Sequence, residues 1–575
     1  MPETDRLAAL PAKGHPKGLY ILFATEMWER FNYYGMRAIL VLFMTKALLF
    51  DKAFASNLYG SYTGLIYLTP LLGGFIADRY WGNHRSIITG GLVMALGEFI
   101  LFFCGSLYQS APSASSLLFF SGLGLMIAGN GFFKPNISSL VGQLYPDHDT
   151  RKDAAYTIFY MGINVGGALG PFACGLAGDT GNPADFKWAF LVGGIGMLVS
   201  VLVQVLFHHK YVVGPNNKVL GLVPDDAPKK ATSPFVVFPG LVLLSLVTIG
   251  LIYADAKIFN YLFYLLIACI LFIAFVVFSD KSLSGPEKSK VGVIFIVSFF
   301  VIFFWSAFEQ AGASLTFFAD EQTNRHLGLV VPAWVVYLFS ALLAGIIILL
   351  FRKTARNLAG AFNAKLRNVV YGLLILFVIA ILAGIFFMVS HHRQAIDLNE
   401  VPASFFQSLN STFVVLFAPL FAWLWLTMGR KEPSSPTKMA LGLLLLALGY
   451  LWIAFGVKDV QPNIKVSMIW LTGMYALHTC GELCLSPIGM SLVNKLSPLK
   501  FASLLMAVWF TANAFANKLA GVLSALYPDG KTTSFLGYQM HNLFEFFMLF
   551  VVMAGTASLI LFLLTRKLQK MMQAQ

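Results

Sequence analysis

The chain has 575 residues, of which 58% are hydrophobic and only 12% charged, and its mean hydropathy is +0.73. This composition excludes an ordinary soluble protein, in which charged residues make up roughly a quarter of the chain. The net charge of +13 does not indicate a nucleic-acid partner, because the basic residues lie in short loops between apolar segments. The five cysteines are odd in number and lie in apolar segments, so no disulfide framework is expected.

Apolar runs of about 20 residues recur along the chain, and each is long enough to cross ~30 Å of hydrocarbon as a helix. We therefore predict an all-α polytopic membrane protein with about sixteen transmembrane helices. The polar segment 1–18 runs directly into a long span, which favours a retained N-terminal tail over a cleaved signal peptide. The predicted spans begin near Leu19, Phe54, Arg85, Ser115, Lys152, Phe186, Phe235, Phe259, Val291, Gly328, Arg367, Val401, Lys438, Lys465, Lys500 and His541.

The loops between the predicted spans alternate in charge. Every second loop is basic, as at Arg79 and Arg85, Arg151 and Lys152, Lys210 to Lys230, Lys281 to Lys290, Arg352 to Arg367, Arg430 to Lys438, and Lys495 and Lys500. The intervening loops are poorer in Lys and Arg, so the positive-inside rule places both termini in the cytoplasm. We expect a multi-pass plasma-membrane protein, in a bacterium a protein of the inner membrane, that functions as a monomer.

A repeat relates the segments KPNISSLVGQLYP, 134–146, and SPIGMSLVNKLSP, 486–498. Pro, Ser-Leu-Val, Leu and Pro recur at identical spacing, and Gly129 and Gly481 extend the match upstream. A chance match of common membrane residues is the alternative. Both segments are predicted to run in the same direction, however, which is typical of transporters built from two parallel repeats with a site between them.

The repeat and the spans together predict the domain organisation. A cytoplasmic N-terminal tail, 1–18, precedes a six-helix bundle, 19–210, and a linker with two extra transmembrane helices, 211–290. A second six-helix bundle, 291–567, is interrupted at about 328–390 by two extra transmembrane helices, and a cytoplasmic tail, 568–575, follows. An even number of inserted spans preserves the topology.

The first span, ATEMWERFNYYGMRAIL, carries four charges. An ionisable residue in a bilayer costs about 2.5 kcal/mol or more, so it usually faces a partner or a water-filled cavity. Glu26 lies one turn before Glu29 and Arg30, and Arg30 lies two turns before Arg37, which makes one polar stripe. An ion-pair cluster that only holds helices together is the alternative, but four charges exceed what helix association needs.

Other spans carry single charges at Lys134, Glu309 and Glu482. Together with the charges of the first span, the positive and negative charges nearly balance. A central polar cavity in which these residues change ion-pair partners would explain all of them. Glu98 and Lys518 are interpreted as structural residues or as side chains that snorkel towards the membrane surface. His478 is interpreted as a packed neighbour rather than a proton carrier. Candidate cavity-lining residues are Tyr33, Tyr34, Tyr67, Trp305 and Trp509, with the amides of Asn164, Asn410 and Asn513.

Motifs of the common energy-coupled and metal-dependent enzymes are not found. The sequence has no Walker loop, no H-E-x-x-H and no paired C-x-x-C. We therefore expect no enzymatic activity and no cofactor.

With these residues assembled, the sequence resembles the proton-dependent oligopeptide transporter family of the major facilitator superfamily. Glu26, Glu29, Arg30, Phe31, Tyr33, Tyr34 and Gly35 match its E-x-x-E-R-F-x-Y-Y-G signature in full. GGFIADRYWGNHR, 73–85, resembles the superfamily's loop between the second and third helices, and FYMGINVG, 159–166, resembles the family's fifth-helix motif. Ser411 stands where proline is usual, and the spans at 328–390 have no counterpart in the usual bacterial pattern.

The resemblance implies a major facilitator fold and a set of residue roles. Arg37 and Lys134 would hold the peptide carboxylate, Glu482 the amine, Asn164 and Asn410 the backbone, and Tyr33, Tyr34, Tyr67, Trp305 and Trp509 would complete the substrate site. Glu26, Glu29 and Arg30 would couple proton binding to transport, with Glu309 pairing with Arg37 or Lys134. The second span has no histidine, where animal members carry one, so carboxylates would serve as proton sites.

The expected function is proton-coupled symport of di- and tripeptides by alternating access across the lipid bilayer. Transport of another small anion, such as nitrate, on the same fold is the nearest alternative, although an anion has no amine for Glu482 to pair. A transport-inactive receptor or an enzyme is a third possibility. The complete set of charges on the first span argues against an inactive receptor, and the lack of a recognisable catalytic motif argues against an enzyme.

Overall fold

The computed structural model describes residues 14–146, 149, 151–223, 234–257, 261–332, 395–461 and 464–573, with isolated positions between 333 and 345. The chain forms two compact units. One comprises Met1–Thr323 and Ala403–Gln575, and the other Asn324–Pro402. Residues 1–13 of the predicted N-terminal tail lie outside the described residues, and so does most of the predicted insertion at 328–390.

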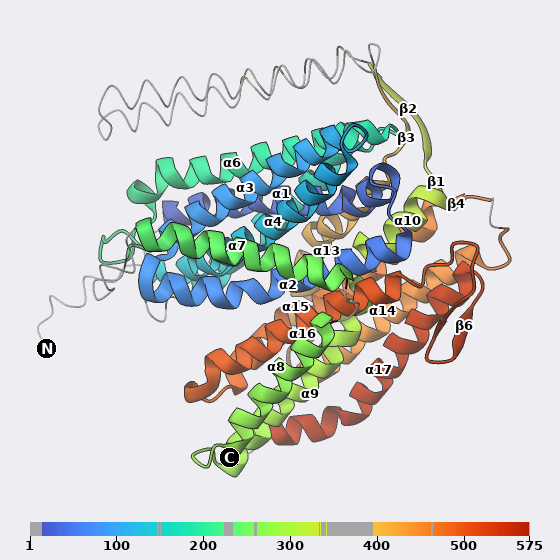
Figure 1. Ribbon diagram of the computed structural model, residues 1–575. Helices are drawn as coiled ribbons and strands as arrows, with labels where there is room; N and C mark the ends of the chain where they lie inside the picture. The colour runs from blue at the N-terminus through green and yellow to red at the C-terminus, as the bar shows by residue number, and fades with distance from the viewer. Residues whose placement is uncertain are drawn as a thin grey trace, which may run out of the picture. The chain divides into compact units, whose positions relative to one another are not determined.

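Six helices from the first third of the chain pack together in the larger unit (Figure 1). α1 packs against α5 and α6, and α3 packs against α4 and α6. Most of their residues are apolar, and the buried ones come from every helix, so the core lies between the helices rather than on one face of a layer. The helices are α1 Lys17–Leu42, α2 Lys52–Ile76, α3 Asn83–Leu107, α4 Pro112–Gln143, α5 Arg151–Gly178 and α6 Phe186–Tyr211, with short η2 Phe43–Ala47, η3 Ala77–Trp81 and η4 Pro183–Asp185.

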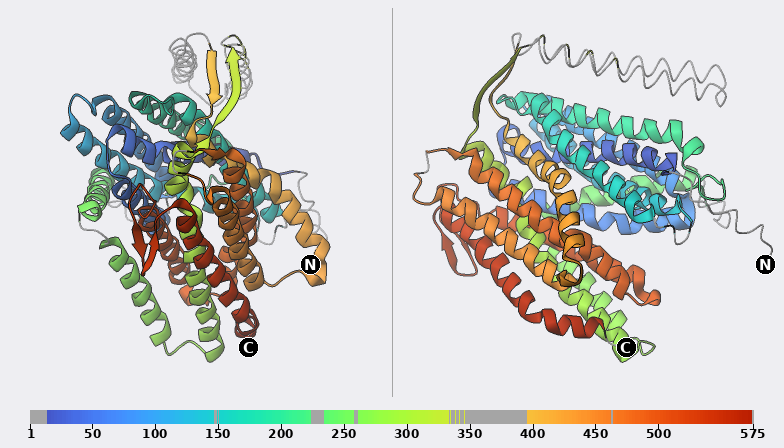
Figure 2. Two further views of the ribbon diagram at one scale, coloured as in Figure 1. Left: turned by 90° about the vertical axis from the view of Figure 1, so that its right-hand side faces the viewer. Right: turned by 180° about the vertical axis from the view of Figure 1, so that it is seen from behind.

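A second group of helices follows in the same unit, drawn in green, orange and red in Figures 1 and 2. α14 packs against α15 and α17, and α9 packs against α16 and α17. The helices are α9 Gly285–Phe308, α10 Ser314–Glu321, α13 Phe406–Met428, α14 Ser435–Val457, α15 Met468–Leu496, α16 Ala502–Ser524 and α17 Leu543–Met572. Short helices are η5 Glu309–Gly312, η6 Ala403–Phe405, η7 Gly429–Lys431 and η8 Leu499–Phe501, and short strands are β1 Thr323–Asn324, β4 Val466–Ser467, β5 Thr533–Phe535 and β6 Tyr538–Met540.

The repeated segments occupy corresponding places in the two groups. Pro135 and Pro487 both lie inside the last part of a long helix, α4 and α15. A Cβ added at Gly129 of α4 would lie 2.6 Å from the Gly90 carbonyl oxygen of α3, and one added at Gly481 of α15 would lie 2.7 Å from the Gly442 carbonyl oxygen of α14. Both repeats therefore use a glycine for the close approach of a neighbouring helix.

Two helix pairs join the groups. α2 meets α16 where a Cβ added at Gly60 would lie 2.8 Å from the Gly521 Cα. α5 meets α13, where the Ser408 hydroxyl donates to the Ala168 carbonyl oxygen at 2.8 Å. Each pair contains one helix from each group, so these two contacts involve four different helices.

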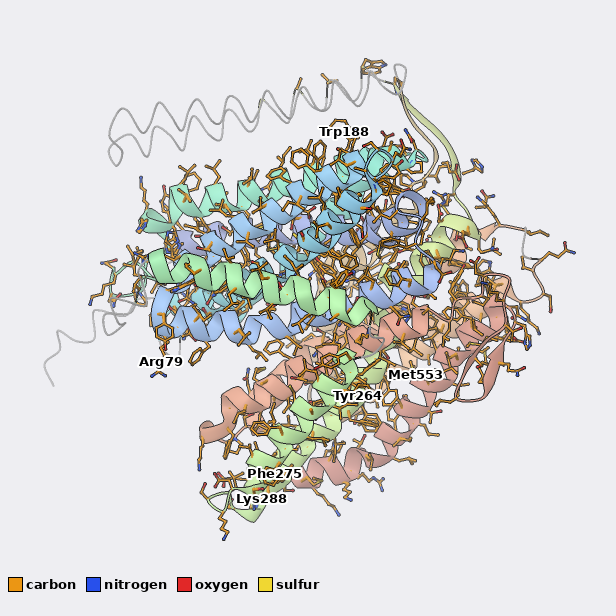
Figure 3. All side chains as sticks on the ribbon, viewed as in Figure 1. Arg79, Trp188, Tyr264, Phe275, Lys288 and Met553 are labelled. Carbon is orange, nitrogen blue, oxygen red and sulfur yellow. The ribbon has the colours of Figure 1, made fainter. Side chains whose placement is uncertain are left out.

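The predicted extra helices of the linker are present as α7 Pro234–Lys257 and α8 Tyr261–Ser279. α7 packs on α4, where the Thr248 hydroxyl donates to the Gly124 carbonyl oxygen at 2.8 Å, and α8 packs on α16. Figure 3 shows Tyr264 and Phe275 on α8, and these side chains are 72% and 70% exposed. Large exposed apolar side chains on a helix of this length are typical of a lipid-facing surface.

The smaller unit contains an antiparallel ladder of β2 His326–Pro332 and β3 Ala395–Glu400, visible in Figure 2. Val331 pairs with Ile396, and Pro332 pairs with Ala395. The prediction that a transmembrane helix begins at Gly328 is therefore wrong for 328–332. Proline biases the preceding residue towards extended backbone, and the β-branched run before it favours a strand.

Fourteen helices of 19 residues or more in the described part of the chain match fourteen of the predicted spans. The remaining predictions, with starts near Gly328 and Arg367, fall mostly outside the described residues. Nine of the described helices are long and apolar enough to cross a membrane by length and composition. α1 is not among them, and it carries Glu26, Glu29, Arg30 and Arg37. A polytopic helical membrane protein is the fold class that these helices define.

Candidate functional site

Three charged residues of α1 form a buried cluster. The Arg30 Nε lies 2.9 Å from Glu26 Oε1 and 2.6 Å from Glu29 Oε2, and all three residues are at most 3% exposed. On the neighbouring helix α4, the Asn130 amide donates to Glu29 Oε1 at 3.2 Å. One arginine thus contacts two carboxylates and can neutralise only one of them, so protonation of either carboxyl group would leave the remaining pair balanced in charge.

Seven residues after Arg30, Arg37 connects the two groups of helices. Its Nη2 lies 2.7 Å from Glu309 Oε2 of η5, and both side chains are buried. The guanidinium also lies over the rings of Tyr34 and Tyr59, 5.7 and 6.0 Å from the centroids, as in cation–π contacts. The sequence left open whether Glu309 pairs with Arg37 or Lys134, and the structure pairs it with Arg37.

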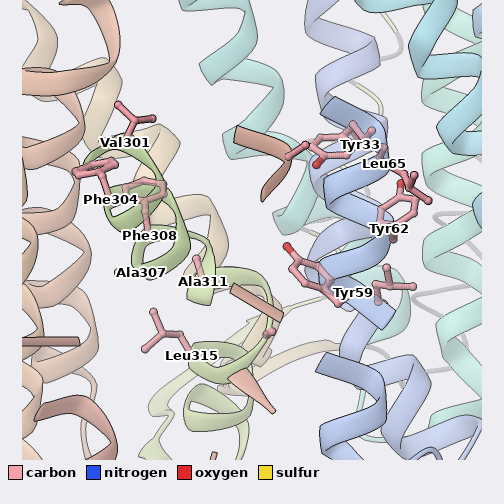
Figure 4. Close-up of a cluster of buried hydrophobic side chains, with 14 of the residues drawn as sticks. Tyr33, Tyr59, Tyr62, Leu65, Val301, Phe304, Ala307, Phe308, Ala311 and Leu315 are labelled. Atoms are coloured by element: carbon pink, nitrogen blue, oxygen red, sulfur yellow. The ribbon is translucent and has the colours of Figure 1, made fainter. Parts of the chain in front are cut away.

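A glycine makes room for this pair. Figure 4 shows Tyr59 extending from α2 towards the segment that contains Ala311. A Cβ added at Gly312 would lie 1.7 Å from the Tyr59 hydroxyl and 3.0 Å from the Arg37 Nε. Any larger residue at position 312 would therefore displace the groups around the Arg37–Glu309 ion pair.

The ammonium group of Lys134 on α4 lies 4.5 Å from the centre of the Tyr67 ring of α2. No ion pair joins Lys134 to a carboxylate in the described part of the chain. Its charge is therefore balanced at longer range, and the cation–π contact leaves it able to pair with an added anion.

Glu482 lies on α15 and is 9% exposed. The Asn410 amide of α13 donates to Glu482 Oε2 at 2.8 Å and lies 3.2 Å from the Thr479 hydroxyl. The bond to Asn410 orients the carboxylate without neutralising it. Among the described residues Glu482 has no cation in an ion pair, so it can accept one from a ligand.

The remaining predicted site residues come from four helices. Tyr33 and Tyr34 on α1 have ring centroids 5.2 Å apart. The Asn164 amide of α5 donates to the Tyr160 carbonyl oxygen of its own helix at 2.9 Å. The Trp305 Nε1 of α9 is buried and has no hydrogen-bond partner among the described residues, so it is an available donor.

Trp509 of α16 completes the predicted set. It is 4% exposed, and a Cβ added at Gly489 of α15 would lie 2.1 Å from its Cη2. The indole thus packs directly on the glycine backbone of α15, two residues after Pro487 of the repeated segment.

Three ionisable residues that we interpreted as structural are buried between helices. His478 is 2% exposed, and its ring packs 4.7 Å from the Tyr450 ring. The Lys518 ammonium donates to the Ser61 hydroxyl at 2.8 Å. The Asn32 amide donates to Glu98 at 2.8 Å. Glu98 and Lys518 are 0% and 1% exposed, so the snorkelling interpretation is wrong for both.

Sequence reasoning missed three members of the site: Asn130, Tyr59 and Thr479. Asn130 is flanked by glycines in the middle of an apolar helix, a pattern that could have singled it out as a buried amide. Thr479 lies three residues before Glu482, on the same helical face. No comparable signal marks Tyr59. In the described part of the chain, no group of three or more His, Cys, Asp or Glu residues could hold a metal ion.

Comparison with known proteins places this arrangement in a family. The sequence matches the POT family over residues 84–394 and 385–544. It is 30% identical to a peptide transporter of Yersinia enterocolitica, with 89% of this chain and 88% of the relative covered, and 29% identical to a di-/tripeptide transporter of Lactococcus lactis, with 91% and 92% covered. The chain belongs to the POT family of membrane transporters.

A solved structure extends the similarity to three dimensions. A crystal structure of a POT family transporter in complex with 5-aminolevulinic acid superimposes with a TM-score of 0.73 at 27% identity, with 97% of this chain and 98% of that chain covered. The shared fold therefore includes nearly the whole chain.

Proposed function

We propose that the chain is a proton-coupled symporter that imports di- and tripeptides by alternating access. The substrate class is supported by relatives that are named peptide and di-/tripeptide transporters and that match most of the chain. Transport of nitrate or a similar anion finds no support among these relatives. A simple anion would also leave the Glu482 carboxylate without a partner.

The observation that carries the proposal is the separation of unlike charges on different helices. Lys134 on α4 offers a cation, and Glu482 on α15 offers a carboxylate that only neutral groups contact among the described residues. A short peptide is a zwitterion, and its two ends can be neutralised by these two residues. Tyr33, Tyr34, Tyr67, Trp305 and Trp509 would contact variable side chains, because aromatic surfaces accept many shapes.

Proton coupling is assigned to the carboxylates that already hold basic partners. Protonation of Glu29 or Glu26 would weaken their hold on Arg30, and protonation of Glu309 would release Arg37. Because the Arg37–Glu309 pair joins the two groups of helices, breaking it changes the relative stability of conformations open to opposite sides. Arg37 would then be available to a peptide carboxylate.

The architecture proposed for this cycle is the major facilitator fold. It comprises two six-helix bundles and about four additional helices, sixteen in total, with both termini in the cytoplasm. The paired glycine contacts of α3 with α4 and of α14 with α15 support the two-bundle division. The proposed location is the plasma membrane, in a bacterium the inner membrane, and the proposed functional unit is a monomeric transporter rather than an enzyme.

Uptake into liposomes tests the proposal. Purified protein is reconstituted, an inward proton gradient is imposed, and labelled dialanine is added outside. We expect accumulation that a protonophore abolishes, and no accumulation of nitrate under the same gradient. Dialanine uptake that is indifferent to the protonophore would contradict proton coupling, and an absence of peptide exchange in well-inserted protein would contradict peptide transport.

A further inference from the structure

A buried carboxyl group outside the proposed transport machinery has an unusual set of neighbours. Glu98, on α3, is 0% exposed. On α6, a Cβ added at Gly193 would lie 3.2 Å from Glu98 Oε1 and 3.4 Å from the Asn32 Nδ2, and one added at Gly194 would lie 3.1 Å from the Glu98 Cβ. Two consecutive glycines thus make the space in which Glu98 meets Asn32 of α1.

The contact between these side chains is only half complete. Asn32 Nδ2 donates to Glu98 Oε1 at 2.8 Å, which joins one atom of each planar group. The other atom of each group, Asn32 Oδ1 and Glu98 Oε2, is buried and has no hydrogen-bond partner among the residues that the structure describes. If Glu98 were ionised, both of these atoms would be acceptors, and neither could satisfy the other.

One proton on the Glu98 carboxyl group could give both unpaired oxygens a hydrogen-bond partner. A carboxylic acid can donate through Oε2–H to the amide oxygen while its Oε1 accepts from the amide Nδ2, which closes a ring of two hydrogen bonds. A proton on Glu98 Oε2 would therefore satisfy the two buried oxygens together, through a hydrogen bond to Asn32 Oδ1. It also removes the cost of a buried carboxylate without a cationic partner.

Among the described residues, no cation pairs with Glu98. The ionisable side chains that interact electrostatically with it are Tyr62 of α2 and Cys174 of α5, and neither carries a positive charge in any protonation state. The α4 residues that face Gly97, next to Glu98, are Gly122 and Met126. None of these groups replaces the proton, because none is a cation.

We propose that Asn32 and Glu98 form a proton-binding site distinct from the Glu26–Glu29–Arg30 cluster, in which an acid–amide pair holds one proton. Asn32 lies one turn after Glu29, whose other contact is Asn130 of α4. α1 is therefore held to α4 at one turn and to α3 at the next. The pair makes Glu98 a positioning residue for the coupling cluster.

Infrared spectroscopy of the reconstituted protein without peptide tests the bound proton. At pH 8, where exposed carboxyl groups are ionised, we expect a carbonyl stretching band of a protonated carboxyl group that is lost in Glu98→Gln. Glu29→Gln, which alters a different buried carboxyl, is the matched control and should keep the band. A spectrum of Glu98→Gln identical to that of the wild type in this region would overturn the proposal, and its outcome is independent of peptide transport.

A double-variant comparison tests the positioning role. Glu98→Gln retains a donor and an acceptor facing Asn32, so it should keep dialanine counterflow, whereas Asn32→Leu should lower the thermal midpoint and counterflow together. Asn32→Leu combined with Glu98→Leu replaces both polar partners by apolar groups and should recover most of the midpoint. Additive losses in the double variant, or an unaffected Asn32→Leu single variant, would show that the pair does not hold α1.

Discussion

Arg37 of α1 and Glu309 of η5 form a buried ion pair with a 2.7 Å separation between Nη2 and Oε2. The residues are far apart in sequence and belong to different groups of helices. The pair is thus a structural link, and in the proposed transport cycle it is also the charge pair that a proton opens. Its two properties should be separable by experiment.

Glu309→Gln should lower thermal stability clearly, because removing one partner of a buried ion pair costs about 3–5 kcal/mol. Glu321→Gln is the matched control, since Glu321 pairs with Lys52 at 2.7 Å with a side chain that is 35% exposed. Exposed pairs contribute about 0–1 kcal/mol, so the control should shift the thermal midpoint little. Equal shifts of the two variants in a thermal unfolding measurement would argue that the Arg37–Glu309 pair is not a structural link.

Glu482→Gln should weaken peptides with a free amino terminus far more than amino-acetylated analogues, because the variant removes the charge that would pair with the amine. Competition of each peptide class with labelled dialanine uptake measures the difference. Glu432→Gln, which alters a carboxylate that pairs with Lys438 at the start of α14, should affect neither class. Equal weakening of both peptide classes by Glu482→Gln would exclude the assigned role.

Gly481→Ala should destabilise the protein by about 1–3 kcal/mol, because the added methyl group overpacks the contact with the Gly442 carbonyl. Gly129→Ala should have a similar effect if the repeat preserves the packing. Gly250→Ala on α7 is the control, since nothing lies within 4 Å of its added Cβ, and alanine there should be neutral or stabilising. Thermal midpoints that rank the three variants differently would contradict the repeat in packing.

The long helices could be predicted because a helix that crosses the hydrocarbon core of a bilayer needs about 20 consecutive apolar residues, and such runs are visible in the sequence. The pairing of Glu309 could not, since the choice between Arg37 and Lys134 depends on how helices from two groups meet. The strand β2 was missed because LGLVVP is apolar enough to continue into a span, although the proline and the two valines before it favour an extended segment. The role of Tyr59 depends on the absence of a side chain at Gly312, which is far away in the sequence.

Removing 333–394 and joining Pro332 to Ala395 through an Asn-Gly turn should leave peptide exchange measurable. The two joined residues pair in the β2–β3 ladder, so a two-residue turn can connect them without moving either strand. Counterflow of labelled dialanine in liposomes measures the result, and gel filtration checks folding. A folded, inserted deletion protein without exchange would make the removed segment part of the transport mechanism.

The most direct measurement of the central claim compares Glu29→Gln with the wild-type protein in gradient-driven uptake and in counterflow, on one preparation of known thermal stability. Our account predicts that accumulation of dialanine against its gradient collapses, because a proton site beside Arg30 is lost. It also predicts that counterflow, which needs only peptide binding and the change of access, survives at least in part. A variant that still concentrates dialanine normally would contradict the account, and so would one that loses folding, accumulation and counterflow together.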